Sequence, residues 1–252
     1  MKPTFLKHEK PLLTAMLQSS SLETLSRRIK LALEQGAEAF GLQTESLLLE
    51  DQTPEVYRQL FDQMDGKPIY VTHYRMGGVR KKTDDQIARE LVLLAKTGAT
   101  LCDVMGDLFC PHPEEMTDDP VAIEKQMALI KELHEAGAEV LMSAHIRKFL
   151  PAERVLEMAL EQQRRGADIV KIVVAAENMA QQMENLRIAT LLKETLQVPY
   201  LFLCVGECGI LRRIGGVLGC CMYLCVSERD KESPGVQPLL RQLKPIRDNM
   251  EW

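Results

Sequence analysis

The sequence predicts a single (β/α)8 barrel, because short apolar segments alternate with amphipathic segments along all of its 252 residues. Barrels of this kind commonly contain about 250 residues. A Gly-Ala dipeptide also recurs where an amphipathic segment gives way to an apolar one, at 36–37, 98–99, 137–138 and 166–167. Glycine adopts the left-handed conformation that ends a helix, so each dipeptide predicts a helix-to-strand junction. An open, doubly wound sheet is the alternative, but no G-x-G-x-x-G motif follows the first apolar segment.

Eight short apolar segments are the expected strands. Most are continuous apolar runs rather than alternating ones, which is typical of parallel strands covered on both faces. The expected strands are residues 12–17, 39–43, 69–74, 100–105, 140–143, 169–174, 200–204 and 220–226.

The amphipathic segments between these strands are the expected helices. In residues 121–135, for example, Ile123, Met127, Ile130 and Leu133 recur at helical spacing. Ser21 is the expected N-cap of the first helix. The expected helices are residues 22–35, 84–96, 121–135, 152–165, 179–195 and 239–249, and residues 1–10 form a short extension of the single domain.

The composition argues against several classes of protein. Hydrophobic residues make up 46% of the chain and charged residues 27%, which allows a large core and argues against disorder. The net charge of -5, without a concentrated basic face, argues against a nucleic-acid partner. The longest apolar run, residues 217–226, is about half the length of a membrane span, and the first residues lack a signal-peptide core. We therefore expect a cytoplasmic protein without a membrane segment.

The seven cysteines are expected to be buried thiols, because their number is odd and most lie in apolar, strand-like runs. Cys204 and Cys208 have the spacing C-x3-C, but no second pair accompanies them. The chain contains no H-x-H or H-E-x-x-H motif. We therefore expect neither a metal nor a cofactor.

Lys171 is the most informative residue for function, because it lies inside an otherwise apolar strand. Active sites of (β/α)8 barrels form at the carboxyl ends of the strands. Burying an ammonium group there is costly, so we expect an uncharged amine. Such an amine can attack a carbonyl and form a Schiff base, whose iminium withdraws electrons from the adjacent carbon. The alternative is a lysine that is paired with a carboxylate for a purely structural reason.

His145 directly follows the strand before Lys171, where an imidazole can carry protons near neutral pH. The alternative is a histidine bonded to the backbone. The other candidate residues stand at or beyond strand ends and would bind substrate. They are Gln43, His73, Tyr74, Arg75, Met105, Glu232 and Ser233.

Four stretches resemble the type I 3-dehydroquinate dehydratases. They are VLMSAH at 140–145, GADIVKI at 166–172, GILRRIG at 209–215 and SPG at 233–235. The resemblance extends along nearly the whole chain and implies a metal-free barrel that dehydrates its substrate through a lysine Schiff base. It implies that Lys171 is the Schiff-base lysine and His145 the general acid and base. It also implies that Arg213 binds the substrate carboxylate, and that the chain forms a homodimer.

The chain departs from the family where the family binds its substrate. The family's E-x-R motif is replaced by Gly41 and Gln43 on the second strand. The glutamate before Gly77-Gly78 is replaced by Met76, and the glutamine of the final S-x-P-G-Q motif by Val236. A pocket built for hydroxyl groups rejects analogues because unmatched buried polar groups are costly. We therefore expect a small carbonyl compound that bears a carboxylate, with specificity altered from 3-dehydroquinate.

Two other functions remain open on the sequence alone. The first is a non-catalytic barrel that binds a small carboxylate as a sensor or a regulatory protein. The second is a metal-assisted hydrolase or isomerase that uses His73, Asp103 and His145.

Overall fold

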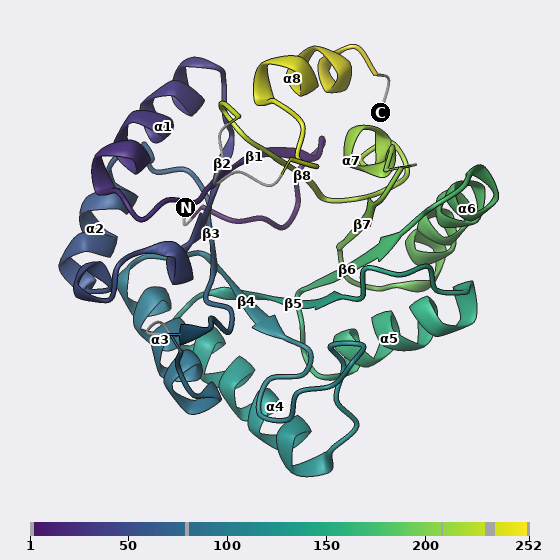
Figure 1. Ribbon diagram of the computed structural model, residues 1–252, viewed down its shortest axis with the longest axis horizontal. Helices are drawn as coiled ribbons and strands as arrows, with labels where there is room; N and C mark the ends of the chain where they lie inside the picture. Colours follow the sequence, from purple (N-terminus) through teal and green to yellow (C-terminus); the bar gives the residue numbers. More distant parts are fainter. Residues whose placement is uncertain (1–2, 79–80, 208, 230–234, 251–252) are drawn as a thin grey trace.

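Eight parallel strands surround a common axis in the computed structural model, and helices surround the strands (Figure 1). The structure describes residues 3–78, 81–207, 209–229 and 235–250. The strands are β1 (Leu12–Leu17), β2 (Ala39–Gln43), β3 (Ile69–Thr72), β4 (Leu101–Met105), β5 (Glu139–His145), β6 (Ile169–Ala175), β7 (Tyr200–Val205) and β8 (Met222–Cys225). They pair in the order β7-β6-β5-β4-β3-β2-β1-β8, and a parallel bridge from Tyr200 to Cys220 closes the ring. The predicted barrel is confirmed, and the open sheet is wrong.

The six predicted helices are present, together with two that were not predicted. The helices are α1 (Leu22–Glu34), α2 (Pro54–Asp62), α3 (Asp84–Thr97), α4 (Pro120–Glu135), α5 (Ala152–Arg164), α6 (Met179–Thr195), α7 (Leu211–Ile214) and α8 (Leu240–Asp248). Short 3-10 turns, η1 (Thr44–Ser46) and η2 (Leu49–Asp51), follow β2. The unpredicted helix α2 begins at a Thr53 cap, whose side chain accepts a hydrogen bond from the backbone N–H of Val56, with Pro54 in its first turn.

The local signals in the sequence act as expected. Gly36, Gly98, Gly137 and Gly166 all have positive φ angles, between 83° and 135°, at the ends of the preceding helices. Ser21 caps α1 by accepting a hydrogen bond of 3.2 Å from the backbone N–H of Thr24. These junctions turn the chain directly from each helix into the next strand.

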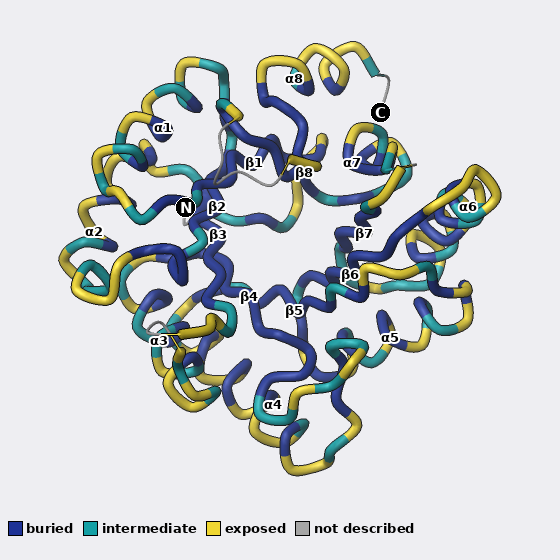
Figure 2. Tube along the Cα trace, in the orientation of Figure 1, coloured by how far each residue is buried: buried dark blue, intermediate teal, exposed yellow. Residues whose placement is uncertain are grey.

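The strands are buried on both faces, whereas the helices expose their outer faces (Figure 2). Phe5, which is 1% exposed, packs against the edge of the Tyr70 ring with the ring centroids 6.5 Å apart. Its backbone N–H donates to Glu139 at the start of β5. Phe5 therefore covers the amino ends of the strands and leaves the carboxyl ends for a site.

The described cysteines are all free thiols. None of the helices in the described ranges is long and apolar enough to cross a membrane.

Candidate active site

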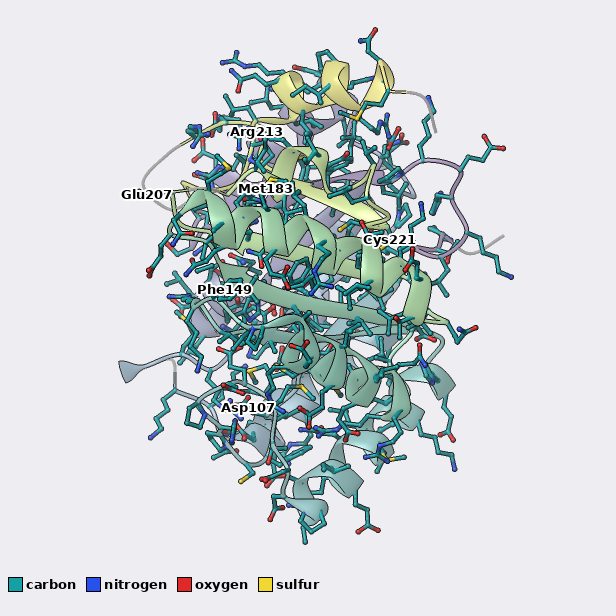
Figure 3. The ribbon with its side chains drawn as sticks, turned by 90° about the vertical axis from the view of Figure 1, so that its right-hand side faces the viewer. Asp107, Phe149, Met183, Glu207, Arg213 and Cys221 are labelled. Carbon is teal, nitrogen blue, oxygen red and sulfur yellow. The ribbon has the colours of Figure 1, made fainter. Side chains whose placement is uncertain are left out.

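The carboxyl ends of the strands surround a cavity of about 840 Å³. In Figure 3, Asp107, Phe149 and Glu207, which follow β4, β5 and β7, lie at one end of the barrel, while Cys221, which precedes β8, lies at the other. All eight strands contribute to the cavity. Their lining residues are Met16, Gln43, Tyr70, Thr72, Met105, His145, Lys171, Val173, Leu203, Val205 and Leu224.

Lys171 lies in this cavity with a side chain that is 5% exposed. Its Nζ donates to the hydroxyls of Tyr70 (3.0 Å) and Tyr74 (2.9 Å) and to Oδ2 of Asp103 (3.1 Å). An ammonium has three N–H donors, so these three bonds use all of them. The sequence led us to expect an uncharged amine. The structure instead places the buried Asp103 carboxylate beside it, so the lysine is part of an ion pair.

Asp103 is buried and forms hydrogen bonds with the polar groups around Lys171. Its carboxylate also accepts hydrogen bonds from the hydroxyls of Tyr70, Tyr74 and Ser143. Burial alone would raise the pKa of Asp103, but the charge of Lys171, that of His145 when its ring is protonated, and the bonds from Ser143 and Tyr70 leave that pKa below its ordinary value. Asp103 is therefore a carboxylate at neutral pH.

His145 forms a pair with Glu115, which sequence reasoning missed. The Nδ1 atom of His145 lies 2.9 Å from Oε2 of Glu115, and the backbone N–H of His145 donates to the same oxygen. Burial and then the charge of Lys171 lower the pKa of His145 below 6.5, while Glu115 partly opposes this shift. The imidazole is therefore neutral at neutral pH. With Nδ1–H directed at Glu115, Nε2 is left as the base.

The loop between β4 and α4 places Glu115 on His145. Glu115 has a φ of 49°, a conformation that is strained for a residue with a side chain. A side chain at Gly106 would lie 2.6 Å from the backbone oxygen of Glu115, so the loop can pack this closely only over a glycine. The sequence indicated that two family acids are lost, at Gly41 and at Met76. A different loop supplies a carboxylate to the histidine.

Replacing Glu115 by glutamine is expected to lower the pKa of His145 further. The negative charge of Glu115 stabilises the imidazolium, so its removal favours the neutral ring. A titration of the His145 ring followed by NMR measures this shift. Glu114→Gln is the matched control, because Glu114 pairs with Lys148 and Arg154 instead. An unchanged or higher pKa in Glu115→Gln would show that the pair does not tune the base.

A second carboxyl group, Glu45, lines the cavity without a cation beside it among the described residues. The hydroxyl of Thr72 donates to both of its oxygens. Burial raises the pKa of Glu45 to about 7. The carboxyl group is therefore partly protonated near neutral pH and able to donate a hydrogen bond to a ligand.

The predicted substrate-binding residues divide into three groups. Gln43, Tyr74, Arg75 and Met105 line the cavity, as does Met76. The His73 ring does not: it is buried beside Thr44, with Nδ1 and Oγ1 2.7 Å apart, and burial lowers its pKa to about 3. Glu232 and Ser233 lie outside the described residues.

Arg75 and Arg212 are held very differently. Arg75 forms ion pairs with Asp84 (2.7 Å) and Asp107 (2.8 Å), which fix its guanidinium at the rim. Arg212 is buried, forms no ion pair with a described carboxylate, and has no hydrogen-bond partner for Nε in that part of the chain. Burial lowers the pKa of Arg212 to about 10, which still leaves it charged at neutral pH.

Two residues in the cavity are offset by one position from the motifs noted in the sequence. The resemblance implies that Arg213 binds the carboxylate, but Arg213 is exposed and lines only a neighbouring pocket. Arg212 lines both that pocket and the central cavity. Gln237 follows Val236, is buried, lines the cavity, and has an Oε1 without a partner in the described structure. The cavity thus contains an arginine and a glutamine, each one position away from the family-motif position in the sequence.

The space of the lost family acid on β2 is filled by a methionine. A side chain at Gly41 would meet the Met16 sulfur at 2.2 Å. The replacement is therefore coupled to the neighbouring strand β1, and the wall of the cavity here is apolar.

The residues of the metal hypothesis are bound to different partners. Asp103 is bonded to Lys171, His145 to Glu115 and His73 to Thr44. Within the described ranges, no three His, Cys, Asp or Glu side chains are grouped as they would be to hold a metal ion.

The comparison with protein families identifies one family over most of the chain. The type I 3-dehydroquinase profile matches residues 13–248. The chain belongs to the type I 3-dehydroquinase family. A 3-dehydroquinate dehydratase of Shouchella clausii is 27% identical over 142 residues, which cover 55% of this chain and 51% of that protein. The match thus spans about half the length of that relative.

Solved structures share the fold of this family member at low identity. The Geobacillus kaustophilus 3-dehydroquinate dehydratase superimposes with a TM-score of 0.82 at 15% identity, covering 95% of this chain and 91% of that one. The type I enzyme of Clostridium difficile, solved with covalent modified comenic acid, gives a TM-score of 0.81 at 16% identity, covering 96% and 92%.

Proposed function

We propose that this family member is a carbon–oxygen lyase that removes water from a small hydroxy-carbonyl acid through a Schiff base on Lys171. The observation that carries the proposal is the shared cavity of Lys171, His145 and Arg212 at the barrel mouth. A nucleophilic amine, a neutral base and a cation for a carboxylate are the groups that such an elimination requires.

In the proposed reaction, the Lys171 ammonium first passes a proton to His145. The free amine then attacks the substrate carbonyl, and His145 returns the proton to the resulting hydroxyl, which leaves as water and gives the iminium. The neutral His145 next removes the proton from the adjacent carbon. The electrons of the broken C–H bond expel the hydroxyl on the next carbon. His145 gives the proton it has taken to this hydroxyl, which leaves as a second water. Addition of water to the iminium releases the product and the lysine.

Asp103 and Glu115 support these steps without touching the reacting carbon. Asp103 lies 3.1 Å from the lysine and stabilises the cation that is present both before attack and in the iminium. Glu115 orients the histidine through Nδ1 and offsets the charge it gains when it holds a proton.

The substrate differs from 3-dehydroquinate in this proposal. The apolar contact of Met16 at Gly41 and the exposed Met76 replace polar side chains of the family motifs. A less hydroxylated substrate matches such a wall better, since it leaves fewer polar groups unpaired.

Arg212→Gln is expected to weaken binding of the substrate acid by about tenfold or more, because the variant loses one charge-assisted hydrogen bond to the carboxylate. Arg213→Gln is the adjacent control and is expected to change it much less, because Arg213 lines the neighbouring pocket. Equilibrium binding of a short hydroxy acid, measured by calorimetry for both variants, compares the two arginines. The opposite ranking would return the role to Arg213.

A turnover assay tests the proposed function. Water elimination from a hydroxy ketone or aldehyde gives a conjugated product that absorbs in the ultraviolet. We expect this absorbance to rise with at least one hydroxy-carbonyl acid of a panel that includes 3-dehydroquinate, and to stay flat with Lys171→Met. Absence of turnover across the panel would favour the non-catalytic alternative, as the fully bonded Lys171 ammonium also does. In that case, carboxylates would raise the melting temperature without reaction.

A further inference from the structure

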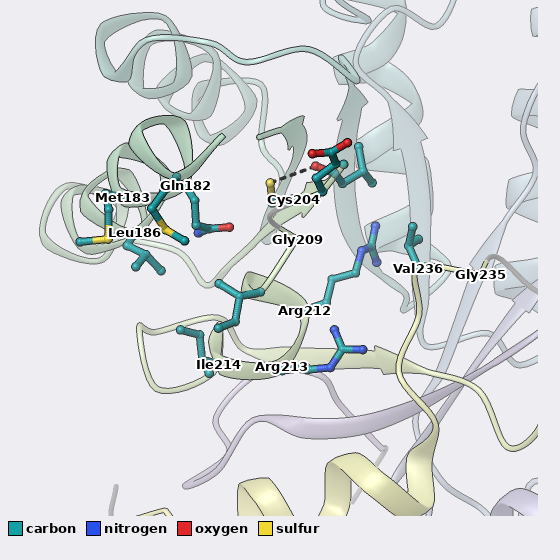
Figure 4. Close-up of a pocket in the computed structure, with 15 residues that line it drawn as sticks. Gln182, Met183, Leu186, Cys204, Gly209, Arg212, Arg213, Ile214, Gly235 and Val236 are labelled. Atoms are coloured by element: carbon teal, nitrogen blue, oxygen red, sulfur yellow. Dashed lines mark hydrogen bonds between the residues drawn. The ribbon is translucent and has the colours of Figure 1, made fainter. Parts of the chain in front are cut away.

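A second pocket of about 560 Å³ lies beside the barrel mouth, between α6, β7 and α7 (Figure 4). Much of its wall is apolar and is formed by Met179, Met183 and Leu186 on α6 together with Ile210 and Ile214. Met179 is 65% exposed and Met183 58% exposed. Flexible methionines gathered in an exposed patch are typical of surfaces that bind apolar ligands.

Gln182 gives this α6–α7 pocket a polar group that lacks a partner. Its side chain is directed toward the pocket in Figure 4, and the residue is 3% exposed. Neither its amide nitrogen nor its amide oxygen has a hydrogen-bond partner within the described chain. Leaving buried polar atoms unpaired is costly, so folded proteins rarely do so without a ligand or water in that place.

The charges of the lining favour an anion. Arg212 and Arg213 contribute two cations, against the single described carboxylate of Glu207. Figure 4 shows both arginine side chains extending toward the segment of Gly235 and Val236. The pocket therefore combines an apolar wall, an unpartnered amide and a net positive charge.

We propose that the α6–α7 pocket binds a small amphipathic acid, in addition to the ligand of the central cavity. Its hydrocarbon chain would extend to Met179, Met183 and Leu186 on α6, while its carboxylate would be bound by Arg213 on the opposite side of the pocket from Gln182. Arg212 lines both cavities, so the occupant lies next to the substrate site. The proposal does not depend on Schiff-base chemistry.

Octanoate is the probe for this site, and methionine methyl groups report where it binds. With 13C-labelled methionine methyls, we expect saturable NMR shifts at Met179 and Met183, which Met→Leu variants assign. Met127 on α4, which is 42% exposed, controls for general surface effects, and Met105 reports on the central cavity. Octanol should bind about tenfold or more weakly than octanoate, the loss of one charge-assisted hydrogen bond.

Variants separate the acid group from the apolar wall. Arg213→Gln should weaken octanoate by about tenfold while leaving octanol unchanged, because only the acid needs the cation. Leu186→Trp should weaken both ligands by filling the pocket. Shifts at Met105 in place of Met183, equal affinity for octanol and octanoate, or no saturable shift at Met183 would each overturn the proposal. None of these results bears on turnover at Lys171.

Discussion

Asp103→Ala is expected to lower the free energy of unfolding by about 3–5 kcal/mol, because it leaves the Lys171 ammonium buried without its counter-ion. The lysine is 5% exposed and the aspartate side chain fully buried, so water cannot replace the lost charge. Chemical denaturation of the wild type and the variant measures the difference. The same variant should lose turnover, since the iminium loses the same stabilising charge.

A double variant separates the ion pair from general damage to the core. Asp103→Leu combined with Lys171→Met replaces both charges with apolar side chains, which is often neutral or even stabilising for a buried pair. We expect it to recover most of the stability lost in Asp103→Ala, with no recovery of turnover. A double variant as unstable as the single one would show that the uncompensated charge is not the cause.

His145→Ala is expected to reduce turnover by about 100- to 10,000-fold, the range typical of a lost general acid and base. The Schiff base should still form, more slowly, because the nucleophile is on Lys171. Turnover and adduct formation, measured side by side, distinguish the two roles. His134→Gln is the matched control, because His134 near the end of α4 pairs with Asp168, and neither residue lines the cavity. Equal activity of His145→Ala and wild type would remove the histidine from the mechanism.

The fold could be predicted because its signals are local. The glycines that end α1, α3, α4 and α5 and the apolar runs of the strands each depend on only a few neighbouring residues. Helix α2 was not predicted because it is short, although a Thr53 cap before Pro54 is a local signal for a helix start. The position of Lys171 in an apolar strand likewise indicated a side chain inside the barrel, where the structure has it.

The groups around the lysine could not be predicted to the same degree. Asp103 also lies inside an apolar strand, β4, so an ion pair between Asp103 and Lys171 could have been predicted from the sequence. Glu115 offered no such signal, since a loop that packs over Gly106 brings it to His145. The adjacent pair Arg212 and Arg213 differs in burial only once the turn into α7 is formed.

Trapping of the Schiff base at Lys171 tests the central claim most directly. A reactive hydroxy-carbonyl acid is incubated with the protein and borohydride, and the modified peptide is identified by mass spectrometry. We expect a stable adduct on Lys171 that depends on the carbonyl compound and is absent from Lys171→Met. Turnover without any adduct at Lys171, or an adduct that persists in Lys171→Met, would contradict it.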